Sequence, residues 1–357
     1  MLIPKKTIFV ALFYSAMTQT IINWYLQHKR DLPWRETQDP YHIWISEIIL
    51  QQTRVAQGLD YYIRFISRFP YISDLAQADE DEVLRMWQGL GYYSRARNIH
   101  AAARDIMSRF DGQFPTTYKD IRSLKGIGPY TAAAIASFAY RLPHAAVDGN
   151  VYRVLSRLFD IDIPIDSTEG KKLFEALAEE LLDKKHPDLF NQAMMEFGAM
   201  QCTPQSPDCN ICPLNESCLA LANNRVDMLP VKKGKTKTRP RYLHFFDVEL
   251  NGKLMLEQRT NDDIWKGLFQ LPLIETKDES LVTEEAVSNL FKAIEIKSLT
   301  LMKEYKHILS HQHLYCKFYK LELISAQLEK EYICIDRTDL EKYAIPRIIE
   351  KYFENKE

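Results

Sequence analysis

The chain has 357 residues, enough for two or three domains that each bury a core of their own. A composition of 46% hydrophobic and 26% charged residues excludes a disordered or fibrous protein. The formal net charge of -2 provides no overall attraction for nucleic acid, so any such surface must come from local clusters of Lys and Arg. No apolar run approaches the roughly 20 residues of a membrane-spanning helix. We therefore expect no membrane partner. Because nothing in the sequence indicates the secreted context that a disulfide framework needs, we expect a cytoplasmic protein.

From about residue 20 to residue 225 the apolar residues recur at helical spacing, as in residues 82–87 and 151–155. Gly and Pro fall between these segments. The pattern predicts an all-α domain over residues 1–228. Residues 8–26 are interpreted as short helical or disordered lead-in.

Glu47 lies in the stretch 44–50, a predicted helix that is otherwise rich in large apolar residues. Apolar neighbours that remove water from a carboxyl group raise its pKa, which suits a general acid. A solvated surface glutamate is the alternative interpretation.

Residues 124–131, Leu-Lys-Gly-Ile-Gly-Pro-Tyr-Thr, precede a helix with an apolar face. Gly126 and Gly128 allow backbone conformations that are closed to other residues, and Pro129 suits the first position of a helix. We predict a helix–hairpin–helix at about residues 122–140. Its N–H groups, its helix N-terminus and Lys125 can bind a DNA phosphate. A plain joint between two helices is the alternative.

Asp148 directly precedes an amphipathic helix that begins near residue 149. An Asp in this position is commonly an N-cap, which is the structural alternative to a chemical role. Together with Glu47 it would supply two carboxyl groups in different environments. Such a pair can break an N-glycosidic bond, one protonating the leaving group and the other offsetting the charge that develops on the sugar.

Four of the six cysteines crowd into residues 202–218 with the spacing C-x6-C-x2-C-x5-C, namely Cys202, Cys209, Cys212 and Cys218. Four thiolates on a short Pro-rich loop can bind one metal centre. Structural zinc sites usually have two C-x2-C pairs, so the uneven spacing favours a [4Fe-4S] cluster over zinc. Cys316 and Cys334 are expected to be buried free thiols.

Residues 229–241 are basic, poor in apolar side chains and bounded by prolines. They predict a solvated linker, which can also contact DNA phosphates. Beyond it, residues 242–250 and 253–258 alternate like strands around the turn Asn251-Gly252, and residues 313–321 form another such segment. Helices are predicted over residues 285–293 and 340–353. Residues 242–357 should therefore form a small α+β domain.

These motifs, in this order, resemble the adenine DNA glycosylases (MutY) of the helix–hairpin–helix iron–sulfur DNA glycosylase superfamily. The likeness covers about residues 21–230, and more weakly the rest. It is carried by residues 32–35 (Leu-Pro-Trp-Arg), 39–41, 44–55, 89–97, the hairpin, residues 147–151 and the cysteine spacing. The resemblance implies a monomeric base-excision-repair enzyme that binds double-stranded DNA. Its substrate would be adenine opposite 8-oxoguanine or guanine, and in a bacterium it would be associated with the nucleoid.

The resemblance also assigns roles to individual residues. Glu47 would protonate adenine N7 and later activate water, and Asp148 would stabilise the sugar cation. Tyr130 and Asn150 would position these two groups. The residues implied in DNA and lesion binding are Gln52 and Tyr92 as wedges, Arg35, Thr53 and Leu90 around the 8-oxoguanine, and Lys125, Gly126 and Gly128 on phosphate.

Tyr130 separates this chain from relatives that resemble endonuclease III. Those enzymes have a lysine at the matching place, which forms an imine with the sugar, whereas a tyrosine cannot. A monofunctional glycosylase that uses water is therefore expected. An endonuclease III-like lyase and a non-catalytic iron–sulfur DNA sensor remain the alternatives.

Residues 265–272 resemble the core of Nudix hydrolases, but the acidic motif that holds Mg²⁺ in that family is absent from residues 275–293. Hydrolysis of a pyrophosphate is therefore not expected, and the resemblance to the adenine DNA glycosylases implies that the C-terminal domain recognises 8-oxoguanine instead. The matching lesion-reading loop is residues 307–313, which contains Ser310 and His311. Leu309 stands where the family has an aromatic residue.

Overall fold

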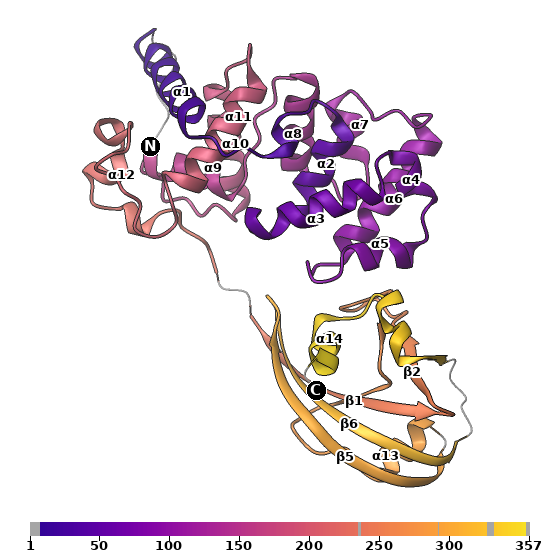
Figure 1. The fold of residues 1–357 in the computed structure, drawn as a ribbon. Helices are drawn as coiled ribbons and strands as arrows, with labels where there is room; N and C mark the ends of the chain where they lie inside the picture. Colours follow the sequence, from indigo (N-terminus) through magenta and orange to yellow (C-terminus); the bar gives the residue numbers. More distant parts are fainter. Residues whose placement is uncertain (1–7, 235–236, 292, 327–331, 355–357) are drawn as a thin grey trace. The chain divides into compact units, whose positions relative to one another are not determined.

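The computed structural model describes residues 8–234, 237–291, 293–326 and 332–354. The chain divides into two compact units. The first unit comprises residues 1–76 and 101–235, and the second comprises residues 77–100 and 236–357. The first unit is helical and the second is built mainly on a sheet (Figure 1). No helix of the described residues is long and apolar enough to cross a membrane.

The helices before the linker are α1 (Ile8–His28), α2 (Pro40–Ile49), α3 (Val55–Arg68), α4 (Ile72–Gln77), α5 (Glu80–Met86), α6 (Ser94–Arg109), α7 (Tyr118–Ser123), α8 (Pro129–Tyr140), α9 (Gly149–Leu158), α10 (Thr168–Leu181), α11 (Pro187–Met200) and α12 (Leu219–Ala222). Short 3-10 helices are η1 (Pro33–Arg35), η2 (Asn215–Ser217) and η3 (Val226–Met228). The all-α prediction for this part of the chain is confirmed.

Helix α2 lies at the centre of the first unit, where it packs against α3 and α8. Its start follows from sequence, because Pro40 occupies a first-turn position and the Asp39 carboxylate accepts a hydrogen bond from the Tyr41 N–H. Most of the helix is buried, including Trp44 and Ile45 at 0% exposure. A polar side chain on this helix is therefore held in an apolar environment.

Residues 8–28 form one continuous helix, so the prediction of a short or disordered lead-in is wrong. The cause is long-range packing: Met17, Ile21 and Tyr25 are buried in a core shared with α9, α10 and α11. The Thr18 hydroxyl also donates to the Leu181 carbonyl at 3.0 Å. These partners lie about 160 residues away, and local periodicity does not reveal them.

The second unit contains a seven-stranded sheet in the order β3-β2-β1-β6-β5, with β4 on β1 and β7 on β2. The strands are β1 (Arg239–Leu250), β2 (Lys253–Gln258), β3 (Phe269–Gln270), β4 (Leu273–Thr276), β5 (Ala293–Ile308), β6 (Gln312–Ala326) and β7 (Ile333–Ile335). Its other elements are α13 (Glu284–Phe291), η4 (Arg337–Lys342) and α14 (Arg347–Glu354). The central pair, β1 and β6, is parallel, and β5 pairs with β6 in the antiparallel sense.

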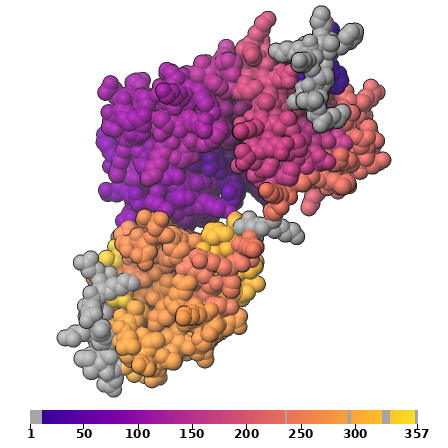
Figure 2. All heavy atoms as spheres, turned by 180° about the vertical axis from the view of Figure 1, so that it is seen from behind, coloured from indigo at the N-terminus to yellow at the C-terminus, as the bar shows by residue number. Residues whose placement is uncertain are grey.

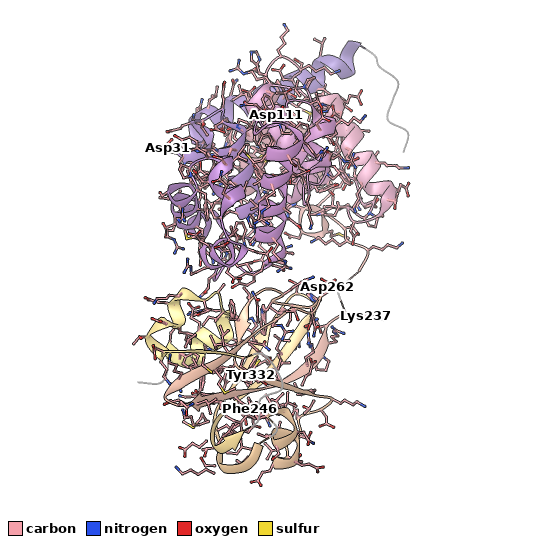
Figure 3. The ribbon with its side chains drawn as sticks, turned by 90° about the vertical axis from the view of Figure 1, so that its right-hand side faces the viewer. Asp31, Asp111, Lys237, Phe246, Asp262 and Tyr332 are labelled. Atoms are coloured by element: carbon pink, nitrogen blue, oxygen red, sulfur yellow. The ribbon has the colours of Figure 1, made fainter. Side chains whose placement is uncertain are left out.

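The two C-terminal helices cover opposite faces of this sheet (Figure 1). On one face, Phe246 and Tyr332 both contact Phe291 of α13 (Figure 3). On the other face, Tyr352 of α14 stacks on Phe318 of β6 with ring centroids 4.5 Å apart. Strand β1 is buried without interruption from Leu243 to Val248, and because successive side chains point to opposite faces, this α+β unit has a core on each face.

The predicted element boundaries in the second unit need three corrections. Strand β1 begins at Arg239, inside the predicted linker 229–241, because this segment pairs with β6 and the Arg241 guanidinium is held by Asp263 and Glu275. The predicted helix 340–353 is instead η4 and α14, with Pro346 between them. Strand β5 was not predicted. Among the two isolated cysteines, Cys316 is buried as expected, but Cys334 is exposed.

Residues 77–100 bond to the C-terminal elements of the second unit. The Arg97 guanidinium donates to the Lys266 carbonyl at 2.6 Å. The Gln88 side chain donates to Glu350 at 2.9 Å and accepts from the Ile345 N–H at 3.2 Å. This segment therefore has partners far along the chain.

The Asp247 carboxylate has 0% exposed side chain and accepts from Arg337 at 2.6 Å and from the Tyr352 hydroxyl at 3.0 Å. We expect Asp247→Ala to destabilise the second unit by about 3 kcal/mol, because it removes a buried acceptor of the Tyr352 hydroxyl and leaves the Arg337 guanidinium with the more distant carboxylate of Glu249, at 3.4 Å. Thermal unfolding monitored by calorimetry measures this. Asp262→Ala is the control, because Asp262 (labelled in Figure 3) is 97% exposed and its ion pair should contribute almost nothing. Equal melting curves for the two variants would contradict the prediction.

Candidate active site

The first unit contains a cavity of about 930 Å³ whose lining residues all lie between Arg30 and Pro204. In the space-filling view the helical part is hollowed, with indigo residues at the bottom of the hollow (Figure 2). Several residues singled out in the sequence meet here, although they come from different helices and turns: Arg35, Glu47, Gln52, Thr53, Tyr130, Asp148 and Asn150. The cavity thus contains Glu47 and Asp148, the two carboxyl groups predicted to form a catalytic pair.

Glu47 is 6% exposed, so the interpretation as a solvated surface glutamate is wrong. Its Oε2 accepts a hydrogen bond from the Tyr130 hydroxyl at 2.6 Å. Burial raises the pKa of Glu47 to about 7, with an added increase from the nearby Asp148. The Tyr130 hydrogen bond and the positive charge of Arg35 oppose this rise. At neutral pH the group therefore exists in both protonation states, which suits a residue that first gives and later takes a proton.

Asp148 is the N-cap of α9, which was the alternative to a chemical role for this residue. It also lines the cavity, so the two roles are compatible. Its Oδ1 accepts from the N–H groups of Asn150 and Val151, both at 2.8 Å. Its Oδ2 accepts from the Asn150 side-chain amide at 2.7 Å. Burial raises the pKa of Asp148, whereas these hydrogen bonds act in the opposite direction. A helix cap thus also fixes the orientation of a cavity carboxylate.

The predicted helix–hairpin–helix is formed by α7, the turn at residues 124–128 and α8. The buried Leu124 and Ile127 anchor the turn, while Lys125, Gly126 and Gly128 are exposed. Gly126 has φ +80°, a conformation that favours glycine. Gly128 has an ordinary φ of -84°, so the expectation of an unusual backbone there is wrong. A Cβ at Gly128 would meet open space, and the glycine leaves room for a group that approaches the start of α8.

Three charged side chains in the cavity wall form a cluster that was missed by sequence reasoning: Arg30, Arg35 and Glu196. The Glu196 carboxylate is 1% exposed and binds both guanidinium groups. Arg35 therefore lies in the same cavity as Glu47, and it also lies over the Tyr25 ring. No local signal marks Glu196, since its partners are about 160 residues away and its own helix reads as ordinary amphipathic sequence.

The four cysteines of residues 202–218 line one cavity, together with Arg157 of α9. Within the part of the chain that the structure describes, no three Cys, His, Asp or Glu side chains are arranged to hold a single metal ion. The four thiols surround one space, as a metal centre bound by four thiolates requires. Arg157 bonds to Thr203 O and Pro204 O, which ties α9 to this loop.

A chain of hydrogen bonds joins the cysteine loop to Asp148. The Arg153 guanidinium donates to the Cys202 carbonyl at 2.7 Å and to the Asn150 side-chain oxygen at 2.8 Å. Asn150 in turn donates to Asp148. Close packing of α11 supports the arrangement, because a Cβ at Gly198 would lie 2.7 Å from the Asn150 Cβ. The position of one cavity carboxylate therefore depends on the loop.

The remaining sequence-predicted residues, Leu90, Tyr92, Ser310 and His311, belong to the second unit. The Tyr92 hydroxyl and the Ser310 hydroxyl are hydrogen-bonded to each other. His311 is exposed, and its carbonyl accepts from the Arg239 N–H. Leu90 is nearly buried, and Tyr92 is 43% exposed.

The two residues interpreted as wedges share an uncommon backbone conformation. Gln52 has φ +58° and Tyr92 has φ +48°. Positive φ in a non-glycine residue costs free energy and is concentrated at functional sites. Seven other non-glycine residues of the described chain also have positive φ, so the conformation is compatible with a special role of Gln52 and Tyr92 but does not single them out.

Comparisons with known proteins agree with this geometry. Residues 45–184 match the HhH-GPD superfamily of base excision DNA repair proteins, residues 202–218 match the iron–sulfur binding domain of endonuclease III, and residues 245–355 match the NUDIX domain. An adenine DNA glycosylase of Buchnera aphidicola (subsp. Baizongia pistaciae) is 40% identical, covering 83% of each chain. Another, from the subspecies Acyrthosiphon pisum, is 33% identical over 95% of this chain and 97% of its own.

The chain belongs to the adenine DNA glycosylase family. A solved structure described as a thermostable thymine-DNA glycosylase is also similar, with a TM-score of 0.55 and 29% identity over 59% of this chain and 97% of its own. As an adenine DNA glycosylase, the protein is a hydrolase of N-glycosyl bonds that acts on DNA in base excision repair. The loop at residues 202–218 holds a [4Fe-4S] cluster, as expected of the family's iron–sulfur domain. The predicted helical glycosylase fold and the Nudix-like C-terminal part are both confirmed.

Proposed function

We propose that this adenine DNA glycosylase removes adenine opposite 8-oxoguanine or guanine by hydrolysis, after the adenosine has been flipped out of the duplex. The observation that carries the proposal is the buried Glu47, bonded to Tyr130 in one cavity with Asp148. With a pKa of about 7, Glu47 is partly protonated at neutral pH. A protonated Glu47 can give its proton to a purine nitrogen, which makes the base a better leaving group.

Asp148 then offsets the positive charge that develops on the sugar, since its ionised form is held by three N–H donors. Glu47, now ionised, takes a proton from the attacking water. Tyr130 stands at the place where related lyases have lysine, and its hydroxyl positions Glu47 instead of forming a bond to the sugar. The enzyme is therefore proposed to be monofunctional, with Asn150 holding Asp148 in place.

The remaining assignments follow from the positions of the residues. On the family resemblance, Gln52 and Tyr92 are proposed as wedges, and both have left-handed backbone. Thr53 and Leu90 are proposed to line the site of the opposing 8-oxoguanine. Lys125, Gly126 and Gly128 expose the start of α8, a place where N–H groups attract phosphate. Because Arg35 lines the cavity with Glu47, we propose that it contacts the flipped adenine and not, as the sequence suggested, the opposing 8-oxoguanine.

The four cysteines, Cys202, Cys209, Cys212 and Cys218, are proposed as the cluster ligands. We also propose that the enzyme acts as a monomer in the cytoplasm, with residues 1–228 as catalytic domain, 229–238 as linker and 239–357 as lesion-recognition domain. Nucleoid association in a bacterial cell follows from its DNA substrate.

The proposal is tested by incubating the protein with duplexes that contain adenine opposite 8-oxoguanine, guanine or cytosine and cleaving the abasic products with alkali. We expect base release from the first two only, with no strand cleavage before alkali. Absence of base release from every duplex would rule out the glycosylase activity, and borohydride trapping through a lysine would rule out the monofunctional mechanism.

Tyr130→Phe removes the hydrogen bond that lowers the pKa of Glu47. The pKa of Glu47 should therefore rise, and the loss of activity at alkaline pH should move upward by about one pH unit. We also expect excision at pH 7 to slow about tenfold, because the carboxyl group loses the donor that orients it. Single-turnover rates across pH 5–9 measure both effects. A shift of the alkaline limb to lower pH would contradict the prediction.

Ser310→Ala should reduce the preference for 8-oxoguanine over guanine by about threefold to tenfold, the range expected for one neutral hydrogen bond. The physical reason is that the Ser310 hydroxyl is exposed and already orients the Tyr92 hydroxyl, so it can bond a lesion beside that ring. The ratio of excision rates for the two mispairs measures this preference. Ser298→Ala, which lies on β5 and outside the turn that contains Ser310, serves as control, and an equal ratio in both variants would refute the role.

A further inference from the structure

Glu196 of α11 joins two arginines in the wall of the cavity. Its Oε1 accepts from the Arg30 backbone N–H at 3.0 Å, from the Arg30 Nε at 2.8 Å and from the Arg35 NH1 at 3.0 Å. Its Oε2 accepts from the NH2 groups of Arg30 and Arg35, both at 2.6 Å. A carboxylate that is 1% exposed thus has five donors from two residues.

Hydrogen bonds also fix the position of the Arg35 side chain. The Arg35 guanidinium donates to the Arg30 carbonyl at 2.9 Å, and it is 14% exposed. Arg30 follows α1 and Arg35 ends η1, so a single residue of α11 holds both turns beside the cavity. Among the described residues of the cavity wall, Glu196 is the carboxylate that bonds to both guanidinium groups. Its loss would leave both of them without a carboxylate partner there.

The three groups have a definite charge. Burial alone would raise the pKa of Glu196, but the hydrogen bonds from Arg30 and Arg35 outweigh it and lower that pKa to about 2. Glu196 is therefore ionised throughout the pH range in which the enzyme can be assayed. Two guanidinium groups and one carboxylate have a combined charge of about +1. Of these three groups, the Arg35 guanidinium lowers the pKa of Glu47.

We propose that Glu196 is a positioning residue that holds Arg30 and Arg35 in the cavity wall and limits the positive charge acting on Glu47. The groups that face Glu47 are Tyr130 from α8, Asp148 from the start of α9 and Arg35 from η1. Of these, only Arg35 is a cation, and its charge is the one that Glu196 offsets. The inference rests on the proposed role of Glu47 as the proton donor.

The electrostatic consequence has a definite sign. Glu196→Gln keeps the shape of the side chain but raises the charge of the three groups from about +1 to about +2. A stronger positive charge stabilises the ionised form of Glu47 and lowers its pKa. Less of the enzyme would then carry the proton at neutral and alkaline pH, while at acid pH Glu47 would still be protonated.

The test is the pH dependence of single-turnover adenine release by three variants of the full chain. For Glu196→Gln we expect the alkaline limb to move down by about one unit, with about tenfold loss at pH 8 and much smaller loss at pH 5.5. Arg30→Gln, which reduces the charge to about 0, should move the limb upward. The double variant Glu196→Gln/Arg30→Gln has the wild-type charge of about +1 and should return the limb to its wild-type position.

A purely structural role would slow all three variants by the same factor at every pH. That outcome, or shifts of the same sign in both single variants, would overturn the inference. If Glu196→Gln does not fold, Arg30→Gln alone still decides the question, because an alkaline limb that stays at its wild-type position or moves downward in that variant would overturn the inference. Failure of the proposed function is distinguished by wild-type protein, which would then release no adenine, and by Glu47→Gln, which should be inactive at every pH.

Discussion

Glu47→Gln is expected to slow adenine release by at least about a thousandfold while leaving DNA binding intact. General acid catalysis contributes roughly 10²–10⁴-fold, and the same group is proposed to activate water, so both steps are lost together. The isosteric amide still accepts the hydrogen bond of Tyr130, which preserves the geometry of the cavity. Single-turnover assays and binding to the same adenine-containing duplex separate the two effects.

The same substitution should stabilise the folded protein above pH 7. Glu47 has its pKa raised from 4.5 to about 7, so the folded state binds more protons than the unfolded state between these values. Stability therefore falls as the pH rises through this interval, by about 3 kcal/mol in total, and the cost remains at higher pH. Removing the ionisable group should remove that cost. Chemical denaturation at pH 5 and pH 8.5 measures the difference.

Glu36→Gln is the matched control, because Glu36 is an exposed glutamate close in sequence to the cavity residues. It should change neither the rate nor the pH dependence of stability. Activity of Glu47→Gln within tenfold of the wild type would contradict the proposed role of Glu47. If the stability difference between Glu47→Gln and the wild type were the same at pH 5 and pH 8.5, the raised pKa of Glu47 would be contradicted.

Cys212→Ser is expected to cost the protein its iron, about 10 °C of melting temperature and most of its activity. The cluster binds to folded chain, so its binding free energy supports folding, and about 4 kcal/mol corresponds to such a shift in a domain of this size. Cys202, Cys212 and Cys218 pack against the core of α1, α9, α10 and α11, which explains why the effect should spread.

The activity loss should come through α9 and not through lost cations of the loop, because residues 202–218 contain neither Lys nor Arg. When the loop moves, Arg153 loses the Cys202 carbonyl, so the guanidinium that bonds to Asn150 is held less firmly, by the carbonyls of Gly198 and Gly149. Iron content, melting temperature and excision rate test this together. Cys334→Ser is the control, since that thiol is exposed and far along the chain, and a similar loss of iron in it would contradict the assignment.

The parts of the site that sequence could predict are those with local causes. Glu47 is surrounded by apolar residues of its own helix, and Asp148 caps the helix that follows it. The four cysteines lie within one short loop. In each case the physical reason for the feature is contained in about ten neighbouring residues, and the spacing alone made it visible.

The parts that sequence could not predict depend on partners far away. Glu196 acquires its role from two arginines about 160 residues earlier, and α1 is held by packing against α10 and α11. Strand β5 carries charged residues on both sides and shows no clean alternation, yet it pairs with β6 over most of its length. At Gly128 a local motif was misleading: the hairpin sequence predicted a backbone conformation open only to glycine, whereas the residue has an ordinary one.

The bonds made by residues 77–100 have a consequence for synthesis of the chain. This segment emerges early, but its partners Lys266, Ile345 and Glu350 are made about 170 to 260 residues later. A product that stops near residue 235 would contain every residue of the catalytic cavity and none of these partners. A chain that terminates there should therefore still be able to form the catalytic cavity. Its segment containing Leu90 and Tyr92 should stay hydrated, because these later hydrogen-bond partners are missing.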